Sequence, residues 1–408
     1  MSKTTLSEHY YKYIGGGRQH PLPYPIFYPK YIKRAKDVFI WSYDGKKFID
    51  LWMGFGSVIL GYNNKKFNNE IFKQFENGHL FSGPSVYEKE LYLYLKKFIN
   101  LKNFKIKYSI TGSQSVQLAI NIAREYTKKK YIIVLGAYHG MNETISSKKI
   151  IRGEINLPID KIKKIIKNKD VAAIVLEPIL TNKGLIKSKS TWIEELYELC
   201  VKNDIILISD ETVTGFRVSP GFVIEKIYKI SSDIMIGSKS LGNGIPFSMV
   251  IGEEKIMDLI LPIGRVFFGG TYFGNVVSLK AAITTLKILD KKGFLILERI
   301  THKLIKYLQN EIEKFDLSLS WVPGMFWIYF AENKIPDRPS QIKTFLHEKL
   351  YYSFTKECIS QNLFVPSSPY EPFFVSLSHK GYEKLISNIL IDCIERVMKD
   401  KKYDDSLS

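Results

Sequence analysis

Cysteine is scarce in this chain, and its few cysteines form no recognisable framework. The 408 residues include three cysteines, Cys200, Cys358 and Cys393, which are odd in number and far apart. Disulfide scaffolds use even numbers of cysteines, and structural zinc sites use close pairs of cysteine or histidine. We therefore expect three free thiols in the reducing cytoplasm and no bound metal.

Long apolar segments and the common nucleotide-binding loops are also missing. No stretch approaches the ~18 apolar residues of a membrane span, and the first residues, Met1 to Thr5, begin no signal peptide. We expect no membrane partner. Neither G-x-G-x-x-G nor G-x-x-x-x-G-K-[ST] occurs. We therefore do not expect the chain to bind a dinucleotide through such a motif or to use P-loop chemistry.

Positive charge is abundant, with 59 Lys and Arg against 41 Asp and Glu and a formal net charge of +18. The lysines are spread along the whole chain, and no basic stripe interleaved with aromatic residues is visible in the linear sequence. A nucleic-acid face needs clustered charge rather than a high total. We expect no nucleic-acid partner, and a nucleic-acid binder stays an alternative suggested by charge alone.

Short apolar runs alternate with helical patterns through the middle of the chain. The runs cover residues 132–135, 172–176, 205–208 and 234–236, and a helical pattern covers 193–202. Continuous apolar runs suit strands that are buried on both faces, so this alternation predicts an α/β fold with a mostly parallel central sheet. A hairpin is predicted over 38–51, and strand-like pieces at 326–329 and 373–376 lie in a helix-rich C-terminal part.

A chain of this length is long for one core and favours two domains. We expect an N-terminal arm and hairpin over residues 1–60 that packs with the small domain. A large α/β domain would follow over 61–275, and a smaller α+β domain over 276–408.

Side chains that can carry chemistry follow the predicted strands. In chain order these are Tyr138-His139, Glu177, Asp210-Glu211 and Lys239. Ligands bind beyond the carboxyl ends of the strands in an open α/β sheet, so we expect these groups to converge on one edge. Lys239 is the most specific signal, because lysine is rarely buried and a desolvated amine is a nucleophile. A lysine that snorkels from a loop is the alternative.

Residues 111–115, Thr-Gly-Ser-Gln-Ser, open a further helical pattern. A small-residue turn at a helix N-terminus is a ready anion site, because free backbone N–H groups point at the ligand. An ordinary N-cap by Ser113 is the alternative interpretation.

Six ordered motifs carry a family resemblance. They are T-G-S-Q-S (111–115), Y-H-G (138–140), E-P (177–178), D-E-T-V-T-G-F-R-V (210–218), G-S-K-S-L-G-N-G-I-P (237–246) and G-T-Y-F-G-N (270–275). Together they resemble the class III pyridoxal-phosphate (PLP) aminotransferases of fold type I, and within them the glutamate-1-semialdehyde aminomutases most. Weaker matches extend the similarity over about residues 31–395.

The resemblance implies PLP as cofactor, held as a Schiff base by Lys239, which would also move the substrate proton. Asp210 would pair with the pyridinium nitrogen and Tyr138 would stack on the ring. Gly112 and Ser113 would hold the phosphate.

In the same family Thr271 reaches the phosphate of the neighbouring subunit, which implies a homodimer with sites at the subunit interface. His139, Glu177 and Thr212 are further expected neighbours of the cofactor, and Thr212 stands where the family usually has valine. The expected substrate residues are Phe55, Ser57, Glu371 and Arg18.

Three differences separate the chain from the aminomutases. Met141-Asn142 follow Y-H-G where the aminomutase has another histidine, and the segment 141–170 is shorter than the one that carries its gating loop. Its N-terminal arginine aligns close to His20. We therefore expect a PLP-dependent aminotransferase that moves an amino group between a small amino donor and a small carbonyl acceptor. The alternatives are the aminomutase reaction and a non-catalytic PLP-binding protein.

Overall fold

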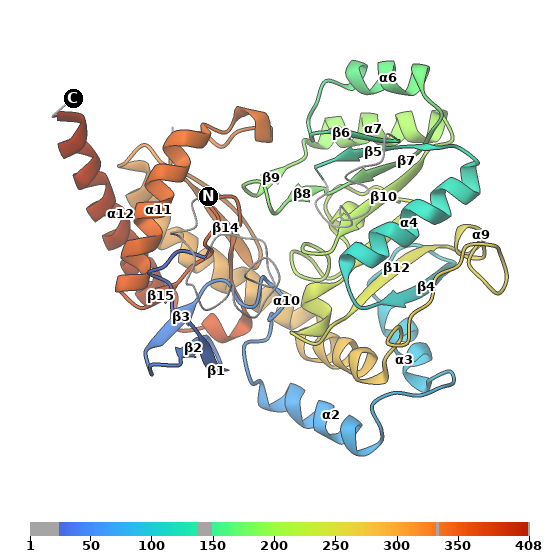
Figure 1. Cartoon of the computed structure of the whole chain (residues 1–408), viewed down its shortest axis with the longest axis horizontal. Helices are drawn as coiled ribbons and strands as arrows, with labels where there is room; N and C mark the ends of the chain where they lie inside the picture. Colours follow the sequence, from blue (N-terminus) through green and yellow to red (C-terminus); the bar gives the residue numbers. More distant parts are fainter. Residues whose placement is uncertain (1–23, 137–148, 332–333, 407–408) are drawn as a thin grey trace.

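The computed structural model describes residues 24–136, 149–331 and 334–406, and its larger sheet has seven strands (Figure 1). Their order is β4-β12-β11-β10-β7-β5-β6. The bounds are β4 (Phe104–Ser109), β5 (Tyr131–Leu135), β6 (Ile150–Gly153), β7 (Val171–Leu176), β10 (Ile206–Glu211), β11 (Ile234–Gly237) and β12 (Ser248–Glu253). Strand β12 runs antiparallel to both of its neighbours, β11 and β4, and the other six strands share one direction. The prediction of a mostly parallel sheet is confirmed.

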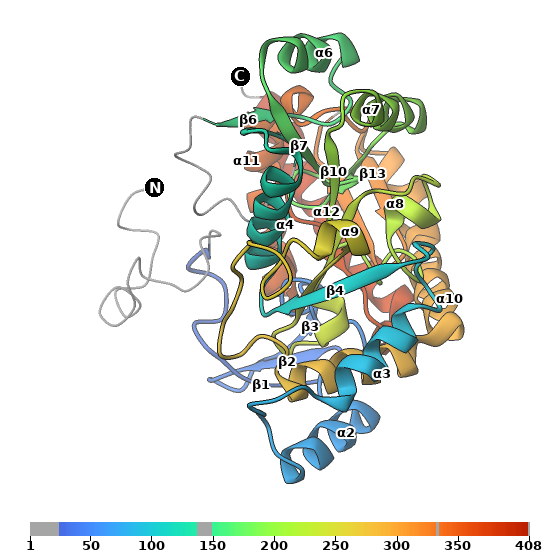
Figure 2. The ribbon, with the colours of Figure 1, turned by 90° about the vertical axis from the view of Figure 1, so that its right-hand side faces the viewer.

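Alternate residues of each strand enter different cores, as a sheet that is covered on both faces requires. Ile133, Leu176 and Met235 join one apolar cluster with α7 (Ser190–Lys202). Val134 and Val175 join the other with α4 (Gly112–Thr127). Figure 2 shows α4 and α7 on opposite sides of the strands.

Shorter elements surround this sheet. They are α2 (Lys65–Glu76), α3 (Val86–Leu95), α6 (Ile159–Asn168), α8 (Val223–Lys226), α9 (Glu254–Met257), the short helix η3 (Lys239–Gly242) and the ribbon of β8 (Ile179–Leu180) and β9 (Ile186–Lys187). Among the described residues, no helix is long and apolar enough to cross a membrane. The three cysteines are free and buried.

The second lobe is built from both ends of the chain. One sheet has the order β1-β2-β3-β15 and another the order β13-β14-β16. Their bounds are β1 (Ile32–Lys36), β2 (Phe39–Ser42), β3 (Lys47–Asp50), β13 (Ser318–Val322), β14 (Met325–Tyr329), β15 (Leu363–Phe364) and β16 (Phe373–Phe374), with η4 (Pro339–Gln341), α11 (Thr344–Ser360), η5 (Leu377–His379) and α12 (Glu383–Ser406) beside them. The predicted hairpin is confirmed as β2 and β3, and β3 pairs in parallel with β15. The domain limits at residues 60 and 275 stay a prediction.

The outer surface of the first of these sheets stacks cations on aromatic rings. The Arg34 guanidinium lies 4.0 Å from the centroid of Trp41, and Lys47 Nζ lies 3.6 Å from that of Phe39. Arg34 and Lys47 both face Trp41 across the strands. This clustering runs across the strands rather than along the chain, so the linear sequence did not reveal it. Stacked cations cover apolar ring surface while their charges stay hydrated.

The long helix α10 (Val276–Glu313) joins the two lobes (Figure 1). It contacts α2, α3 and η3 of the large lobe as well as α12 and β13 of the small lobe. Asp290 interrupts its helical backbone with φ 40° and ψ −171°. The helix therefore bends between its two sets of contacts.

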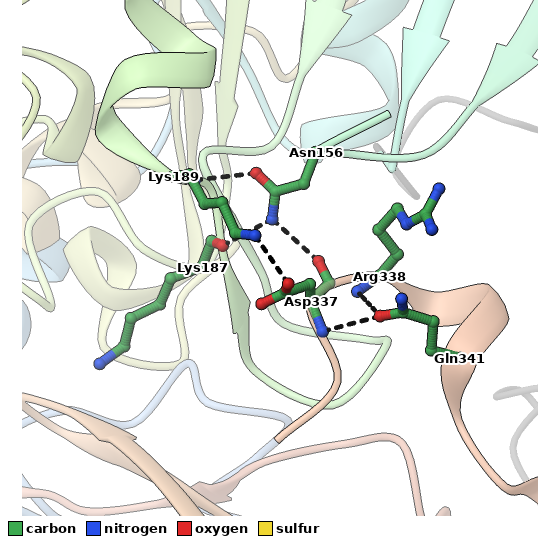
Figure 3. Close-up of polar contacts among 6 residues, drawn as sticks. All are labelled: Asn156, Lys187, Lys189, Asp337, Arg338 and Gln341. Carbon is green, nitrogen blue, oxygen red and sulfur yellow. Dashed lines mark hydrogen bonds and ion pairs between the residues drawn. The ribbon is translucent and has the colours of Figure 1, made fainter. Parts of the chain in front are cut away.

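A polar cluster ties the loop after β6 to the small lobe (Figure 3). Asn156 Nδ2 donates to the carbonyl oxygens of Lys187, at 3.1 Å, and Asp337, at 2.8 Å. Lys189 Nζ pairs with Asp337 Oδ2 at 2.6 Å. Gln341 Oε1 accepts from the backbone N–H of Asp337 at 3.0 Å. These bonds fix the small lobe against the loop after β6, at the edge of the large sheet, and against the segment at the end of β9.

Gly184, between β8 and β9, is a close contact between the lobes. Its φ is +89°, and a Cβ added there would lie 2.6 Å from Cη2 of Trp327. Its N–H donates to the Tyr370 carbonyl at 3.0 Å. A glycine is required both by the backbone conformation and by the indole above it.

We predict that Gly184→Ala lowers the free energy of unfolding by ~2–4 kcal/mol, because it combines a strained φ with overpacking against Trp327. Gly45→Ala is the matched control, since Gly45 has φ +90° but no atom within 4 Å of an added Cβ. It should lose only ~1 kcal/mol. Urea unfolding measures both, and equal losses would show that the Trp327 contact is not tight.

Candidate active site

Lys239 lies two residues after the end of β11 and begins η3 with a backbone φ of 28°. The hydroxyls on either side anchor this conformation: Ser238 Oγ donates to the Phe247 carbonyl at 2.7 Å, and Ser240 Oγ to that of Gly215 at 3.0 Å. A non-glycine residue with positive φ is costly and persists where its surroundings enforce it, as they often do at functional sites. The sequence prediction that Lys239 closes a strand is confirmed.

The electrostatic surroundings of Lys239 suit a reactive amine. Burial lowers its pKa below the usual 10.5, while Glu371 and then Glu177 oppose the shift. The charge of Arg217 lowers the pKa further, and Asp210 raises it. The side chain still keeps part of its surface exposed. An amine with reduced proton affinity and some access is a competent nucleophile.

Asp210 lies on β10 beside Lys239's strand, facing Ile236 of β11. It is 1% exposed, and its Oδ1 accepts from the Thr212 N–H at 3.1 Å and the Thr212 hydroxyl at 2.7 Å. Donors of this kind favour the charged carboxylate. Thr212, in the position where the family usually has valine, therefore orients Asp210.

The N-terminus of α4 packs against the same turn. A Cβ added to Gly112 would lie 2.5 Å from Thr212 Oγ1, so glycine is required by this close approach. The N-cap is Thr111, whose Oγ1 accepts from the Gln114 N–H at 3.3 Å. The alternative of an N-cap by Ser113 is therefore wrong, because the helix begins two residues earlier than that cap requires. Ser113 lies in the first turn, where backbone N–H groups and the helix dipole favour an anion.

Glu177 follows β7 and is 2% exposed. Its Oε1 accepts from the Thr181 hydroxyl at 2.7 Å, and its buried Oε2 has no hydrogen-bond partner within the part of the chain that the structure describes. Burial, reinforced by the charge of Asp210, raises its pKa to about 8. A buried polar atom without a partner is uncommon in native proteins and marks a place where a bound group or a proton is needed.

Glu211 has a different task from the other two strand-end carboxylates. It accepts from the N–H groups of Val223 at 2.5 Å and Ile224 at 2.9 Å, at the start of α8, and from Ser209 Oγ at 3.1 Å. Burial raises its pKa to about 7. Glu211 lies at the same edge of the sheet as Asp210. Neighbouring residues of a strand project to opposite faces of the sheet, so its carboxylate caps α8 instead of facing Lys239.

Glu371 comes from the small lobe yet acts on Lys239. It is 8% exposed, and its Oε2 accepts from Trp52 Nε1 at 2.7 Å. Trp52 stacks edge-on against Phe55 with the ring centroids 4.8 Å apart. Burial raises the pKa of Glu371, and the charge of Lys239 opposes this. Two of the sequence-predicted substrate residues thus meet through Trp52, which the sequence analysis missed because no motif marks it.

Arg217 is a buried clamp. Its guanidinium donates to the carbonyl oxygens of Gly324 at 3.3 Å and Val375 at 3.1 Å, and also to that of Gly56. Burial lowers its pKa to about 9. All three of these hydrogen bonds end on backbone carbonyls. Through them Arg217 holds the loop of Phe55 and Ser57 against the Asp210 loop.

The remaining predicted residues lie apart from this group or cannot be placed. Ser57 Oγ donates to the Gly54 carbonyl at 2.7 Å, within its own turn. Thr271 is exposed in the segment before α10. Tyr138, His139 and Arg18 lie outside the described residues.

Comparison with known proteins gives the family. The model of the class-III aminotransferases matches residues 25–157 and 141–325. A glutamate-1-semialdehyde 2,1-aminomutase of Nitrosopumilus maritimus is 32% identical over 408 residues, which cover 93% of this chain and 95% of that protein. One of Saccharolobus islandicus is 30% identical over 397 residues, 91% of this chain and 90% of that protein. The chain belongs to the class III aminotransferase family and is a PLP-dependent enzyme of that class.

Solved structures confirm the fold. An omega-transaminase from Sphaerobacter thermophilus superposes with a TM-score of 0.87 at 20% identity, and the match covers 96% of each chain. A glutamate-1-semialdehyde aminomutase from Pseudomonas aeruginosa gives a TM-score of 0.84 at 16% identity over 95% of this chain and 93% of that one. The fold class and family predicted from the sequence are both confirmed.

The side chains fit this cofactor. An aldehyde needs an amine of low proton affinity, which Lys239 supplies, and a phosphate needs a helix N-terminus, which α4 supplies at Gly112 and Ser113. A protonated ring nitrogen needs a buried carboxylate, and Asp210 is oriented for charge by Thr212. The three requirements are met at the adjoining ends of β11, β10 and α4.

Proposed function

We propose that this enzyme transfers an amino group from a small amino donor to a small carbonyl acceptor in the cytoplasm. The observation that carries the proposal is Lys239, held at the carboxyl end of β11 with a lowered pKa and with Asp210 at the end of the next strand. A protein that only stored the cofactor would have no need of an activated amine beside an oriented acid. The retention of Lys239, Asp210 and Tyr138 together argues against a non-catalytic role.

Each residue has a distinct task in this proposal. Lys239 binds the cofactor and moves a proton to and from the substrate carbon, and Asp210 holds a proton on the ring nitrogen. Gly112 and Ser113 bind the phosphate. PLP supplies the electron sink for the charge that remains when that carbon loses its proton. Thr212, Glu177, Tyr138 and His139 complete the expected surroundings of the ring.

The assignment of Lys239 predicts a single covalent attachment point. After reduction of the holoenzyme with borohydride, mass spectrometry should find the cofactor on a peptide that contains residue 239. Lys239→Ala should abolish turnover while noncovalent PLP binding persists, because the phosphate site and Asp210 remain. An adduct on any other lysine contradicts the assignment.

We also propose that the enzyme is a homodimer whose sites lie at the subunit interface. Thr271 is exposed in one chain, and exposed apolar side chains precede it in the sequence: Ile263 is 71% exposed and Phe267 76%. Exposed apolar side chains gathered in one segment are characteristic of an interface. A second subunit would cover them and bring Thr271 to its partner's phosphate site.

The dimer proposal predicts complementation between two inactive variants. Mixing Lys239→Ala with Thr271→Arg under conditions that exchange subunits should restore activity. In each heterodimer, one of the two sites combines an unaltered Lys239 from one subunit with an unaltered Thr271 from the other. Light scattering should give twice the chain mass. A monomer with full activity would rule out the shared site.

The second candidate is the aminomutase reaction, an exchange of amino and carbonyl positions within one molecule of glutamate-1-semialdehyde. The two relatives at 30% and 32% identity carry that name. Glu371, held by Trp52 near Lys239, is a carboxyl group suited to an amine-bearing substrate. The sequence differences at Met141-Asn142, in segment 141–170 and near His20 favour two-substrate transamination instead.

Glutamate-1-semialdehyde as sole substrate separates the two reactions. For a two-substrate transaminase we expect 5-aminolevulinate to form at under a hundredth of the rate seen with an amino donor and a separate acceptor, because the intermediate leaves an open site before the second half-reaction. The measurement is the rate of 5-aminolevulinate formation in the absence of any other amine. Efficient formation under these conditions assigns the enzyme to the aminomutases.

A further inference from the structure

Two buried acids stand at neighbouring strand ends in this site. Leu176 of β7 pairs with Ser209 of β10 in parallel register, so the residues that follow them, Glu177 and Asp210, lie at the same edge. They are 2% and 1% exposed. Burial raises the pKa of Glu177, and the charge of Asp210 raises it further. Two like charges close together in a buried site are not both ionised at low cost.

The hydrogen bonds decide which acid carries the charge. Asp210 Oδ1 receives two donors from Thr212, at 2.7 and 3.1 Å. Thr181 favours the ionised form of Glu177 through its hydroxyl, 2.7 Å from Oε1, and through its backbone N–H, but among the described residues the buried Oε2 has no hydrogen-bond partner. A carboxylate oxygen buried without a donor is costly, whereas a protonated one is neutral. The structure therefore favours an ionised Asp210 and a protonated Glu177.

We propose that Glu177 is a neutral carboxylic acid while the enzyme works, and that its proton, carried on Oε2, confines the negative charge at these strand ends to Asp210. This inference rests on the proposed function, in which Asp210 holds the proton on the cofactor nitrogen. Glu177 is then a positioning residue, because it acts through Asp210. An ionised Glu177 would add a second negative charge beside Asp210. That charge would oppose the ionised form of Asp210, which the donors of Thr212 favour.

The proposal has a pH dependence with a definite sign. Among the described residues, the charges that act on Glu177 are Asp210, which favours its protonated form, and Lys239, which favours its ionised form. Burial and Asp210 raise its folded-state pKa to about 8, above the ~4.3 of an unfolded glutamate. The stability that Glu177 contributes is therefore complete below pH ~4 and is lost as the pH rises through about 8.

The test compares wild type with Glu177→Gln in the apo and holo forms. Glutamine keeps an Oε1 acceptor for Thr181 and places a permanent N–H donor where Oε2–H stands. In the apo protein the two melting temperatures should differ little at pH 5.5, and the variant should gain at least ~2 °C on wild type by pH 9. In the holoenzyme, wild-type kcat/KM should fall about tenfold per pH unit above the pKa of Glu177, and this decline should be absent from the variant, whatever its rate at pH 7.

Glu211→Gln is the matched control, because Glu211 is also a buried glutamate with a pKa raised by burial. Its oxygens accept from two backbone N–H groups, which an amide nitrogen cannot replace. This variant should therefore melt below wild type at every pH. Glu177→Gln removes a proton that titrates, whereas Glu211→Gln removes a helix cap. Comparing the two variants distinguishes these effects.

The outcomes distinguish this inference from the proposed function. Parallel melting curves for wild type and Glu177→Gln across pH 5.5–9 would overturn the neutral acid, even if borohydride places the cofactor on Lys239. The absence of any adduct on Lys239 would overturn the proposed function, while the apo melting curves would still decide the protonation of Glu177. If kcat/KM of Glu177→Gln does not decline at alkaline pH while that of wild type does, both the neutral Glu177 and the proposed function are supported.

Discussion

The arrangement of this site depends on the removal of the Lys239 amine from water. An ammonium ion in the interior is costly unless carboxylates surround it or it gives up its proton, and both responses occur here. Glu371 and Asp210 act to hold the proton, while burial and Arg217 act to release it. The pKa of the amine is therefore lower than usual, which favours the free base that attacks a carbonyl compound.

The sheet brings these groups together and Arg217 keeps them there. The carboxyl ends of β7, β10 and β11 supply Glu177, Asp210 and Lys239, but Glu371 belongs to the other lobe. Arg217 bonds carbonyl oxygens from the loop at Gly56, the β13–β14 turn and the segment after β16. A buried guanidinium without these acceptors would be strongly destabilising, so the two lobes are obliged to meet in this position.

The sequence predicted the parts of this protein that depend on local pattern. Continuous apolar runs such as residues 172–176 are long enough to identify strands buried on both faces, and the residue after each run identifies the ligand edge. The sequence pattern could not predict contacts between segments that are far apart in the chain. Trp52 and Glu371 are 319 positions apart and no periodicity links them. The separate task of Glu211 and the cap at Thr111 depend on where α8 and α4 begin, which are details that a sequence pattern resolves only to within a few residues.

The antiparallel strand β12 gives Lys239 a mechanical property that a parallel neighbour would not. The chain leaves the sheet at Gly237 and returns at Ser248, paired with the strand it has just left. Lys239 therefore lies in a connection whose two ends both belong to one hydrogen-bonded sheet. In the proposed function, the bond at the Lys239 side chain can therefore form and break while the backbone on either side stays in the sheet.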